Sequence, residues 1–216
     1  MSSMFRYCKA LKNVDVNSFE TDKVTNMECM FGECESLSNL DLSVFKTDEV
    51  INMAGMFENC KSLENIVIRN FNTSNVKSMS SMFSGCSKLK SLDLTNFDTS
   101  DVVDMSYLFL ECRTLDSLEV GSFNTEHVTA MPFIFCGCAN IKEIDLSNFD
   151  MTQVENNNYM FEACDNLTTI VTPEKTGVNN IILPEGEWYI YDSDEKIINI
   201  PGNTINSITI MKKNND

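Results

Sequence analysis

The amino-acid sequence predicts an α/β fold, a right-handed solenoid in which short parallel strands and short helices stack along one axis. The first observation is a strict internal repeat of cysteines at 26-residue intervals: Cys8, Cys34, Cys60, Cys86, Cys112, Cys138 and Cys164. The second is that rows of Phe, Val, Met and Leu keep the same interval. A unit of this length cannot bury its own apolar side, whereas stacked units can.

The strand of each unit is predicted from an LxxLDL segment, in which apolar residues alternate around one outward residue. Good examples are Leu40-Asp41-Leu42, Leu92-Asp93-Leu94 and Ile144-Asp145-Leu146. We expect these strands to pair in parallel from coil to coil, at a spacing of about 4.8 Å.

The helix is predicted from the second half of the unit. Met27, Met30, Phe31 and Cys34 follow the i, i+3, i+4, i+7 spacing of one helix face. Thr21 and Asn26, with their equivalents, are both candidate N-caps. Pro132 favours the start after Asn26, because proline is tolerated only in a first turn. We therefore expect one helix of about two turns per coil, over 27–34 and its equivalents.

Two regions are expected along the chain: a repeat solenoid over 1–171, with about six full coils and an incomplete first one, and a β-rich C-terminal cap over 172–216. Cap strands are expected near 180–183, 187–191, 196–200 and 206–211, with a turn at Asp192–Glu195. Trp188, Tyr189 and Tyr191 belong either to the packing of this cap or to a sugar or peptide site.

The start of the chain falls inside a unit. MSSMFRYCKALK at residues 1–12 matches MSSMFSGCSKLK at 79–90, so Met1 occupies the helix position of a coil whose strand is missing. We expect the chain to continue a longer array, with an exposed apolar edge around Met4, Phe5, Cys8 and Leu11.

Composition and motifs exclude several functions. The net charge is −16, with 32 acidic and 16 basic residues, so nucleic acid and anionic membranes are poor partners. Apolar runs are too short for membrane insertion. We find no nucleophile–base motif, phosphate loop or metal-ligand spacing, and the only histidine, His127, occupies a variable turn position. We therefore expect no enzyme, no metal and no cofactor.

The cysteines are predicted to be reduced core residues, because a single file of thiols suits neither zinc nor disulfide geometry. Cys29 stands outside the file and is expected to be exposed and reactive. The predicted core rows include Phe31, Cys34, Phe57, Cys60, Phe83, Cys86, Phe109, Cys112, Phe135 and Cys138.

The candidate binding surface is the outward row of the strands. Its acidic members, together with one basic residue beside the interrupting Val67, are Asp15, Asp41, Arg69, Asp93, Glu119 and Asp145. One interpretation is that a solvent-facing strand position simply requires a polar residue. The other is a concave surface for a cationic partner or a divalent cation.

LSVFKTDEVINMAGMFENCKSL and LTNFDTSDVVDMSYLFLECRTL resemble the repeats of BspA-type leucine-rich-repeat bacterial surface proteins. The resemblance covers residues 1 to about 172. It implies a cell-surface or extracellular adhesion and interaction module, lipoprotein-anchored in some members, with a protein or glycan ligand. A spacer in a larger surface protein and a calcium-binding acidic ladder remain as alternatives.

Overall fold

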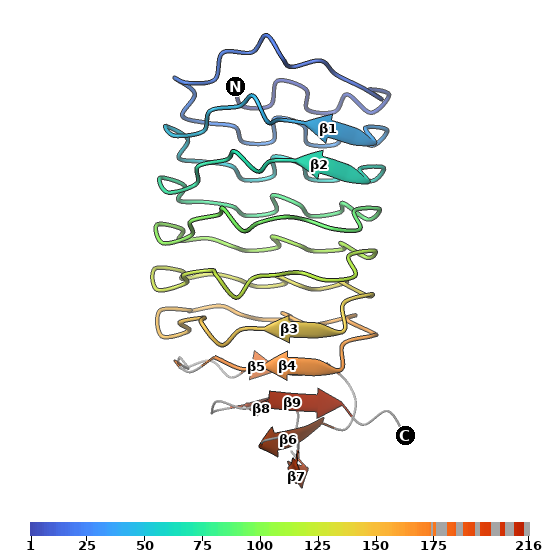
Figure 1. Cartoon of the computed structure of the whole chain (residues 1–216), viewed down its shortest axis with the longest axis vertical. Helices are drawn as coiled ribbons and strands as arrows, with labels where there is room; N and C mark the ends of the chain where they lie inside the picture. Colours follow the sequence, from blue (N-terminus) through green and yellow to red (C-terminus); the bar gives the residue numbers. More distant parts are fainter. Residues whose placement is uncertain are drawn as a thin grey trace.

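The computed structural model describes residues 1–173, 175, 181–184, 188–192, 195–199, 204–205 and 210–213. The repeats form a straight column of stacked coils, with the N-terminus at one end and a small β-structure at the other (Figure 1). β1 (Asn39–Asp41) pairs in parallel with β2 (Asn65–Val67), and β3 (Glu143–Asp145) pairs in parallel with β4 (Thr169–Val171). The stack of short parallel strands predicted from LxxLDL is therefore present, although only four of the described repeats carry an assigned strand.

The predicted helix is wrong: the described residues contain no α-helix, and 27–34 forms a chain of tight turns. Met30 N–H donates to the carbonyl of Met27, and Cys34 N–H to that of Phe31. The alternate amides leave the segment. Phe31 N–H donates to Met56 O of the next coil over 2.9 Å. We call 27–34 and its equivalents the turn segments, and their coil-to-coil hydrogen bonds the turn ladder.

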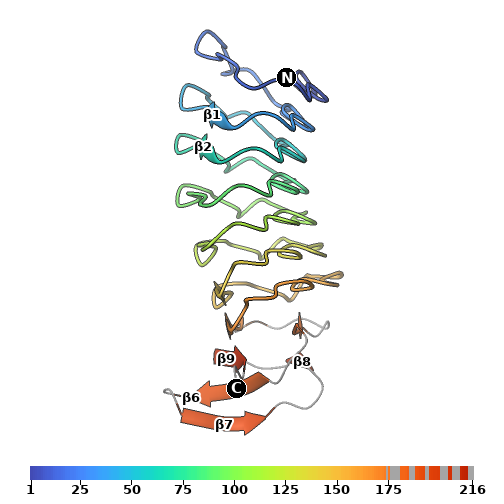
Figure 2. The ribbon, with the colours of Figure 1, turned by 90° about the vertical axis from the view of Figure 1, so that its right-hand side faces the viewer.

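The same apolar spacing is thus satisfied without a helix, because Met27, Met30, Phe31 and Cys34 are all fully buried. An α-helix is about 10 Å wide, whereas parallel strands repeat at about 4.8 Å. Helices on one side of the coils would therefore spread the stack into a curve. Turn segments match the strand spacing, and the column stays straight in both views (Figures 1 and 2). The strand face is accordingly not concave.

The turn segments need a left-handed backbone at two positions of every coil. All fourteen described residues with positive φ fall there, represented by Cys29 (51°) and Glu33 (63°). Glycine occupies the second position where a neighbouring side chain leaves no room. A Cβ on Gly85 would lie 2.4 Å from Asn59 Oδ1, and one on Gly137 would lie 2.9 Å from Glu111 Cδ.

The residues expected to be N-caps keep their hydrogen-bonding role. Asn52 Oδ1 accepts the N–H of Ala54 over 2.9 Å, which closes a small turn two residues long. The equivalent in the sixth coil lacks both partners: Ala130 has no side-chain acceptor, and Pro132 has no N–H to donate. Pro132 is therefore tolerated because its coil needs no such bond, and not because it starts a helix.

The core is built from rows that stack along the column. The rings of Phe31 and Phe57 lie 6.0 Å apart and nearly parallel, and the same row continues to Phe161. A row of buried threonines links successive coils, because each threonine side chain forms a hydrogen bond to the backbone of the following coil. Thr99 Oγ1 donates to Asn124 O over 2.9 Å and accepts Asn124 N–H over 2.8 Å. Thr21, Thr47 and Thr125 make the same pair of bonds with the next coil, and Thr73 Oγ1 donates to Asp98 O. These five residues are the threonine row.

At the C-terminal end of the column lie strands β5 (Ile181–Ile182), β6 (Trp188–Asp192), β7 (Glu195–Asn199), β8 (Thr204–Ile205) and β9 (Ile210–Lys213). β9 pairs antiparallel with β4 and with β6, β6 pairs with β7, and β5 pairs with β8. β5, β6 and β7 lie on expected segments. The strand expected at 206–211 is represented only by the start of β9, and 206–209, like the middle of the Asp192–Glu195 turn, lies outside the described residues.

Candidate binding surfaces

The strand face carries the predicted binding row. Each member is solvent-exposed: Asp15, Asp41, Arg69, Asp93, Glu119 and Asp145. The residues on either side of each acidic residue point inward, as with Leu40 and Leu42 around Asp41. The period of two places these side chains on one surface, as the sequence predicts.

Most of these carboxylates also hold the backbone. Asp41 Oδ1 accepts the N–H of Ser43 over 2.9 Å, and Asp145 Oδ1 accepts that of Ser147 over 2.8 Å. Asp15 and Asp93 make the same turn with Asn17 and Thr95. Hydrogen bonds from Ser43 lower the pKa of Asp41, and those from Thr95 lower the pKa of Asp93. Four carboxylates of the row are therefore held in fixed orientations by their own turns.

The two assigned parallel pairs on this row each match a charged residue with an uncharged one. In both parallel pairs a carboxylate faces a valine: Asp41 opposite Val67, and Asp145 opposite Val171. Where Asp93, Glu119 and Asp145 follow one another, the coils at 91–93 and 117–119 have no assigned strand. Like charges directly opposite destabilise strand pairs, and this repulsion contributes to the loss between Asp93, Glu119 and Asp145. Repulsion does not explain why Val67 and Asp93 also adjoin without pairing.

The cysteine file has a specific hydrogen-bonding role. Cys60 Sγ donates to the carbonyl of Phe31 over 3.2 Å, and the same bond recurs from Cys34 to Cys164. That carbonyl already accepts the N–H of Cys34, so the thiol engages its second lone pair. Burial raises the pKa of Cys86 to about 12 and that of Cys34 to about 11. These thiols are inert packing groups, and the predicted core rows are buried throughout.

The prediction for Cys29 is wrong, because Cys29 is 9% exposed and burial raises the pKa of its thiol. Its Sγ lies over Gly55, where an added Cβ would approach it to 2.9 Å. The missing side chain in the next coil provides the space that Cys29 fills. The exposed thiol is instead Cys8, in the first coil, where Met4 is also 49% exposed.

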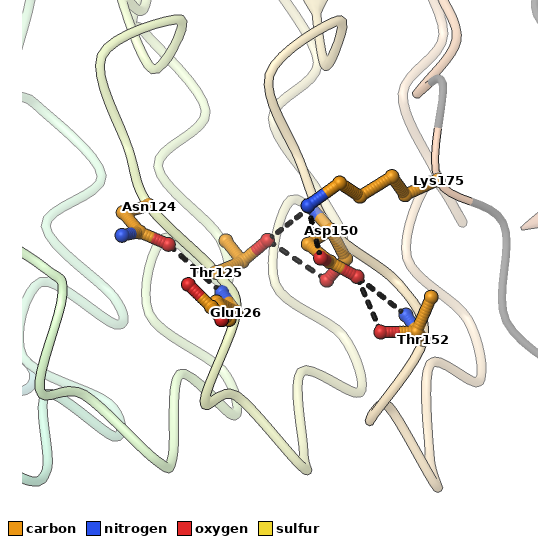
Figure 3. A network of polar contacts seen from close by, with 6 residues as sticks. All are labelled: Asn124, Thr125, Glu126, Asp150, Thr152 and Lys175. Atoms are coloured by element: carbon orange, nitrogen blue, oxygen red, sulfur yellow. Dashed lines mark hydrogen bonds and ion pairs between the residues drawn. The ribbon is translucent and has the colours of Figure 1, made fainter.

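A polar network joins the last threonine of the row to the start of the cap (Figure 3). Asp150 accepts a 2.9 Å hydrogen bond from Lys175 Nζ and another from the N–H of Thr152, and its backbone is bonded to Thr125. Burial opposes ionisation of Asp150, but the hydrogen bonds from Thr152 and Lys175 outweigh it and lower the pKa. The network anchors Lys175 where Met151 interrupts the threonine row.

His127 and Trp188 hold structural positions. His127 Nδ1 lies 2.8 Å from the carbonyl of Ser100, beside an open cavity of about 310 Å³ that Asp150 and Thr152 also line. Trp188 is fully buried, and its indole N–H donates to Pro184 O over 3.0 Å. Of the two roles predicted for the aromatic group of the cap, packing therefore holds for Trp188; the side chain of Tyr191 lies outside the described part.

Metal-ligating clusters and membrane spans are absent from the described residues. No three His, Cys, Asp or Glu side chains gather there as a metal ion would require. Nor does that part of the chain contain a helix with the length and hydrophobicity of a bilayer span.

The sequence interpretation missed a second surface, at the end of the column opposite the N-terminus. Tyr107, Phe133 and Tyr159 stack with centroids 5.2 and 4.8 Å apart, and Tyr159 is 55% exposed. Beyond Tyr159 lies a cavity of about 720 Å³, lined by Asn158, Tyr159, Glu162, Ala163, Cys164, Asp165, Ile182, Leu183 and Pro184. The sequence did contain a signal for this surface: the repeat position held by Gly55 and Ser81 is occupied by aromatic residues in the later coils.

Comparisons with known proteins agree with the repeat architecture only in general terms. No curated protein matches the sequence. A leucine-rich repeat protein from Bacteroides ovatus, solved by crystallography, is 25% identical over 73% of this chain, with a TM-score of 0.37. The chain spans 46% of that protein, and a TM-score this low does not establish a shared geometry.

The family comparison covers the whole repeat region. The sequence matches the family described as "Mycoplasma protein of unknown function, DUF285" at residues 1–92 and 79–177. The two matches overlap at residues 79–92, and each spans several repeats. These matches extend over most of the chain and over every coil of the column, and the chain therefore belongs to this family.

Proposed function

We propose that this protein is a non-catalytic binding and adhesion module displayed on a cell surface, and that its strand face is the ligand-binding surface. The observation that carries the proposal is the row of exposed carboxylates held by their own turns, such as Asp41 with Ser43 and Asp145 with Ser147. Because these groups are already ordered, binding loses little side-chain entropy. The resemblance to BspA-type surface proteins supports the location and the adhesion role.

The mechanism is the addition of several weak contacts along a rigid column. Coils present one carboxylate each at a regular interval, except where Val67, with Arg69 beside it, and Val171 occupy the position. A protein or glycan ligand with cationic groups at a matching interval can contact several coils at once. No described cluster gathers metal ligands, and the proposal needs no catalytic step.

The test removes charge and keeps the fold. In the triple variant Asp41→Asn, Asp93→Asn and Asp145→Asn, the amide oxygen still accepts the turn hydrogen bond, so the melting temperature should change little. The protein is screened against purified extracellular-matrix proteins and a glycan array, and the affinity for any captured ligand is measured by biolayer interferometry. We expect the triple variant to bind at least about tenfold more weakly.

A matched control makes the same change in net charge elsewhere. Asp22→Asn, Asp48→Asn and Asp116→Asn alter exposed carboxylates outside the strand row. This control should bind like the parent protein. Equal affinity of the parent and the strand-face variant would remove this face from the proposal.

A spacer role is the second candidate, and the continuous turn ladder favours it because every coil is bonded to the next. A spacer should show no specific capture in the same screen and should remain extended in small-angle X-ray scattering. Calcium bridging along the acidic row, the remaining alternative, predicts a rise in melting temperature with millimolar calcium and its reversal by EDTA.

A further inference from the structure

The hydrogen bonds of the turn ladder all run in the same direction along the column. In each of six successive coil junctions, amide groups of one turn segment donate to carbonyls of the following coil, and never the reverse. At the fifth junction Tyr107, Phe109 and Glu111 donate to Pro132, Ile134 and Cys136, over 2.9, 2.9 and 2.7 Å. Each coil therefore presents a row of amide donors toward the C-terminal end of the column.

The last turn segment keeps this geometry but has no following coil on the described part of the chain. Tyr159 and Ala163 have the same positive φ as their equivalents, at 59° and 56°. The amides of Tyr159, Phe161 and Ala163 have no acceptor among the described residues. Phe161 is only 1% exposed. A buried amide without an acceptor costs about 1–3 kcal/mol, so the amide of Phe161 indicates a missing partner. Tyr159 and Ala163 are exposed, so their amides remain accessible to the same partner.

The described part of the cap leaves this half of the end open. β9 covers the strand side, because it pairs with β4 at Thr169–Val171. On the turn side, the cavity of about 720 Å³ lies between Tyr159–Asp165 and the segment Ile182–Pro184 that follows the start of β5. Leu183 gives the cavity an apolar wall, and Glu162 and Asp165 give it two exposed carboxylates.

The chemistry of the occupant follows from the donors and the charges. Donors at alternate residues match the alternate carbonyls of a polypeptide, as the six junctions within the column demonstrate. A free anion would meet Glu162 and Asp165 in a protein of net charge −16. Basic side chains on the same peptide would instead pair with these carboxylates.

We propose that the open end of the turn ladder binds a basic peptide segment of a partner protein, which adds to the column as one further turn segment. Its alternate carbonyls accept from Tyr159, Phe161 and Ala163, and its lysine or arginine side chains lie over Glu162 and Asp165. This site is separate from the strand face and does not depend on it.

The probe is a synthetic peptide with the sequence of residues 78–87, in which lysine replaces Ser84 and Ser87 and serine replaces Cys86. In register, these lysines stand one coil beyond Glu162 and Asp165. The full chain, labelled with ¹⁵N, is titrated with this peptide. The amide protons of Tyr159, Phe161 and Ala163 should move downfield, while those of Tyr107, Phe109 and Glu111 stay fixed.

Controls test the charge preference and the independence of this site. A peptide with glutamate at the same two positions should bind about tenfold more weakly, and the double variant Glu162→Lys and Asp165→Lys should reverse that order. The strand-face triple variant should bind the lysine peptide like the parent protein. Unmoved amides at saturation, equal affinity for both peptides, or the same amide shifts produced by inorganic phosphate or an oligosaccharide would overturn the proposal.

Discussion

Buried side chains in this protein form hydrogen bonds to backbone carbonyls as well as packing the core. The thiols of the cysteine file donate to phenylalanine carbonyls 3.1–3.2 Å away, which a valine or an alanine could not do. The sequence shows the periodicity of these cysteines but not the acceptor. The burial of Cys29 was also hidden, because it depends on the absence of a side chain at Gly55 in the next coil.

Thiol reactivity tests the residue-level description. Cys8 is exposed, whereas the other cysteines are buried, and burial raises the pKa of Cys34 and Cys136 to about 11. In the native protein we expect Ellman's reagent to modify Cys8 quickly and the remaining thiols only after unfolding in guanidinium chloride. Peptide mapping locates the modified residues. Rapid native modification of Cys29 or of any residue from Cys34 to Cys164 would contradict this burial.

The Asp150 network predicts an acid-dependent loss of stability. Because hydrogen bonds from Thr152 and Lys175 lower its pKa in the fold, Asp150 contributes stability above its unfolded pKa of about 3.9 and loses it as the pH falls further. In Asp150→Asn the melting temperature should depend less steeply on pH below about 4 than in the parent protein. Asp22→Asn, an exposed site outside the network, is the control; identical profiles for the parent and Asp150→Asn would refute the contribution.

At the scale of the repeat element, the sequence predicted the strand and its outward row but not the turn segment. The i, i+3, i+4, i+7 spacing of Met27 to Cys34 describes which side chains face inward, and helices and chained turns share that property. The choice between them depends on where alternate amides find acceptors, and those acceptors lie one coil away. The left-handed positions at Cys29 and Glu33 give only a weak composition signal, because glycine occurs there in three coils while Tyr, Phe and Glu occur in others.

Removing one hydroxyl from the threonine row should destabilise the column. Thr99→Val leaves the backbone amide and carbonyl of Asn124 without their side-chain partner, at a cost of about 1–2 kcal/mol for the two part-buried bonds. Thr129→Val, at a partly exposed site whose hydroxyl bond is 3.4 Å long, should cost less than about 0.5 kcal/mol. Urea unfolding curves measure both, and equal losses would show that the row contributes nothing specific.

Charge repulsion along the strand face predicts a stabilising substitution. Glu119→Val places an apolar residue between Asp93 and Asp145, as Val67 already stands beside Asp41, and should raise the free energy of unfolding by about 0.5 kcal/mol. The gain should shrink in about 1 M sodium chloride, which screens the charges. A gain that is unaffected by salt would attribute the effect to strand propensity instead.

The whole molecule is a column of bonded coils, and the described part of its C-terminal end is partly open. Its repeat length, the position of its core and the change of structure after about residue 171 follow from the sequence. The rows that contain Phe31 and Cys34 recur every 26 residues along the chain, and this periodicity ends there. The straight axis and the unpaired amides at Tyr159, Phe161 and Ala163 do not follow from the sequence. The straight axis arises because the turn segments match the strand spacing, and the unpaired amides arise from the direction of the coil-to-coil bonds. No local pattern specifies either.

The column as a whole depends on turn segments that bond from coil to coil and form no helix. Scalar couplings across hydrogen bonds, measured by NMR on the deuterated protein, identify the acceptor of each amide directly. We predict couplings from the nitrogen of Phe83 to the carbonyl carbon of Leu108, and from Phe109 to Ile134. A coupling from Phe83 to Met79 instead, the i to i−4 pattern of an α-helix, would contradict this architecture.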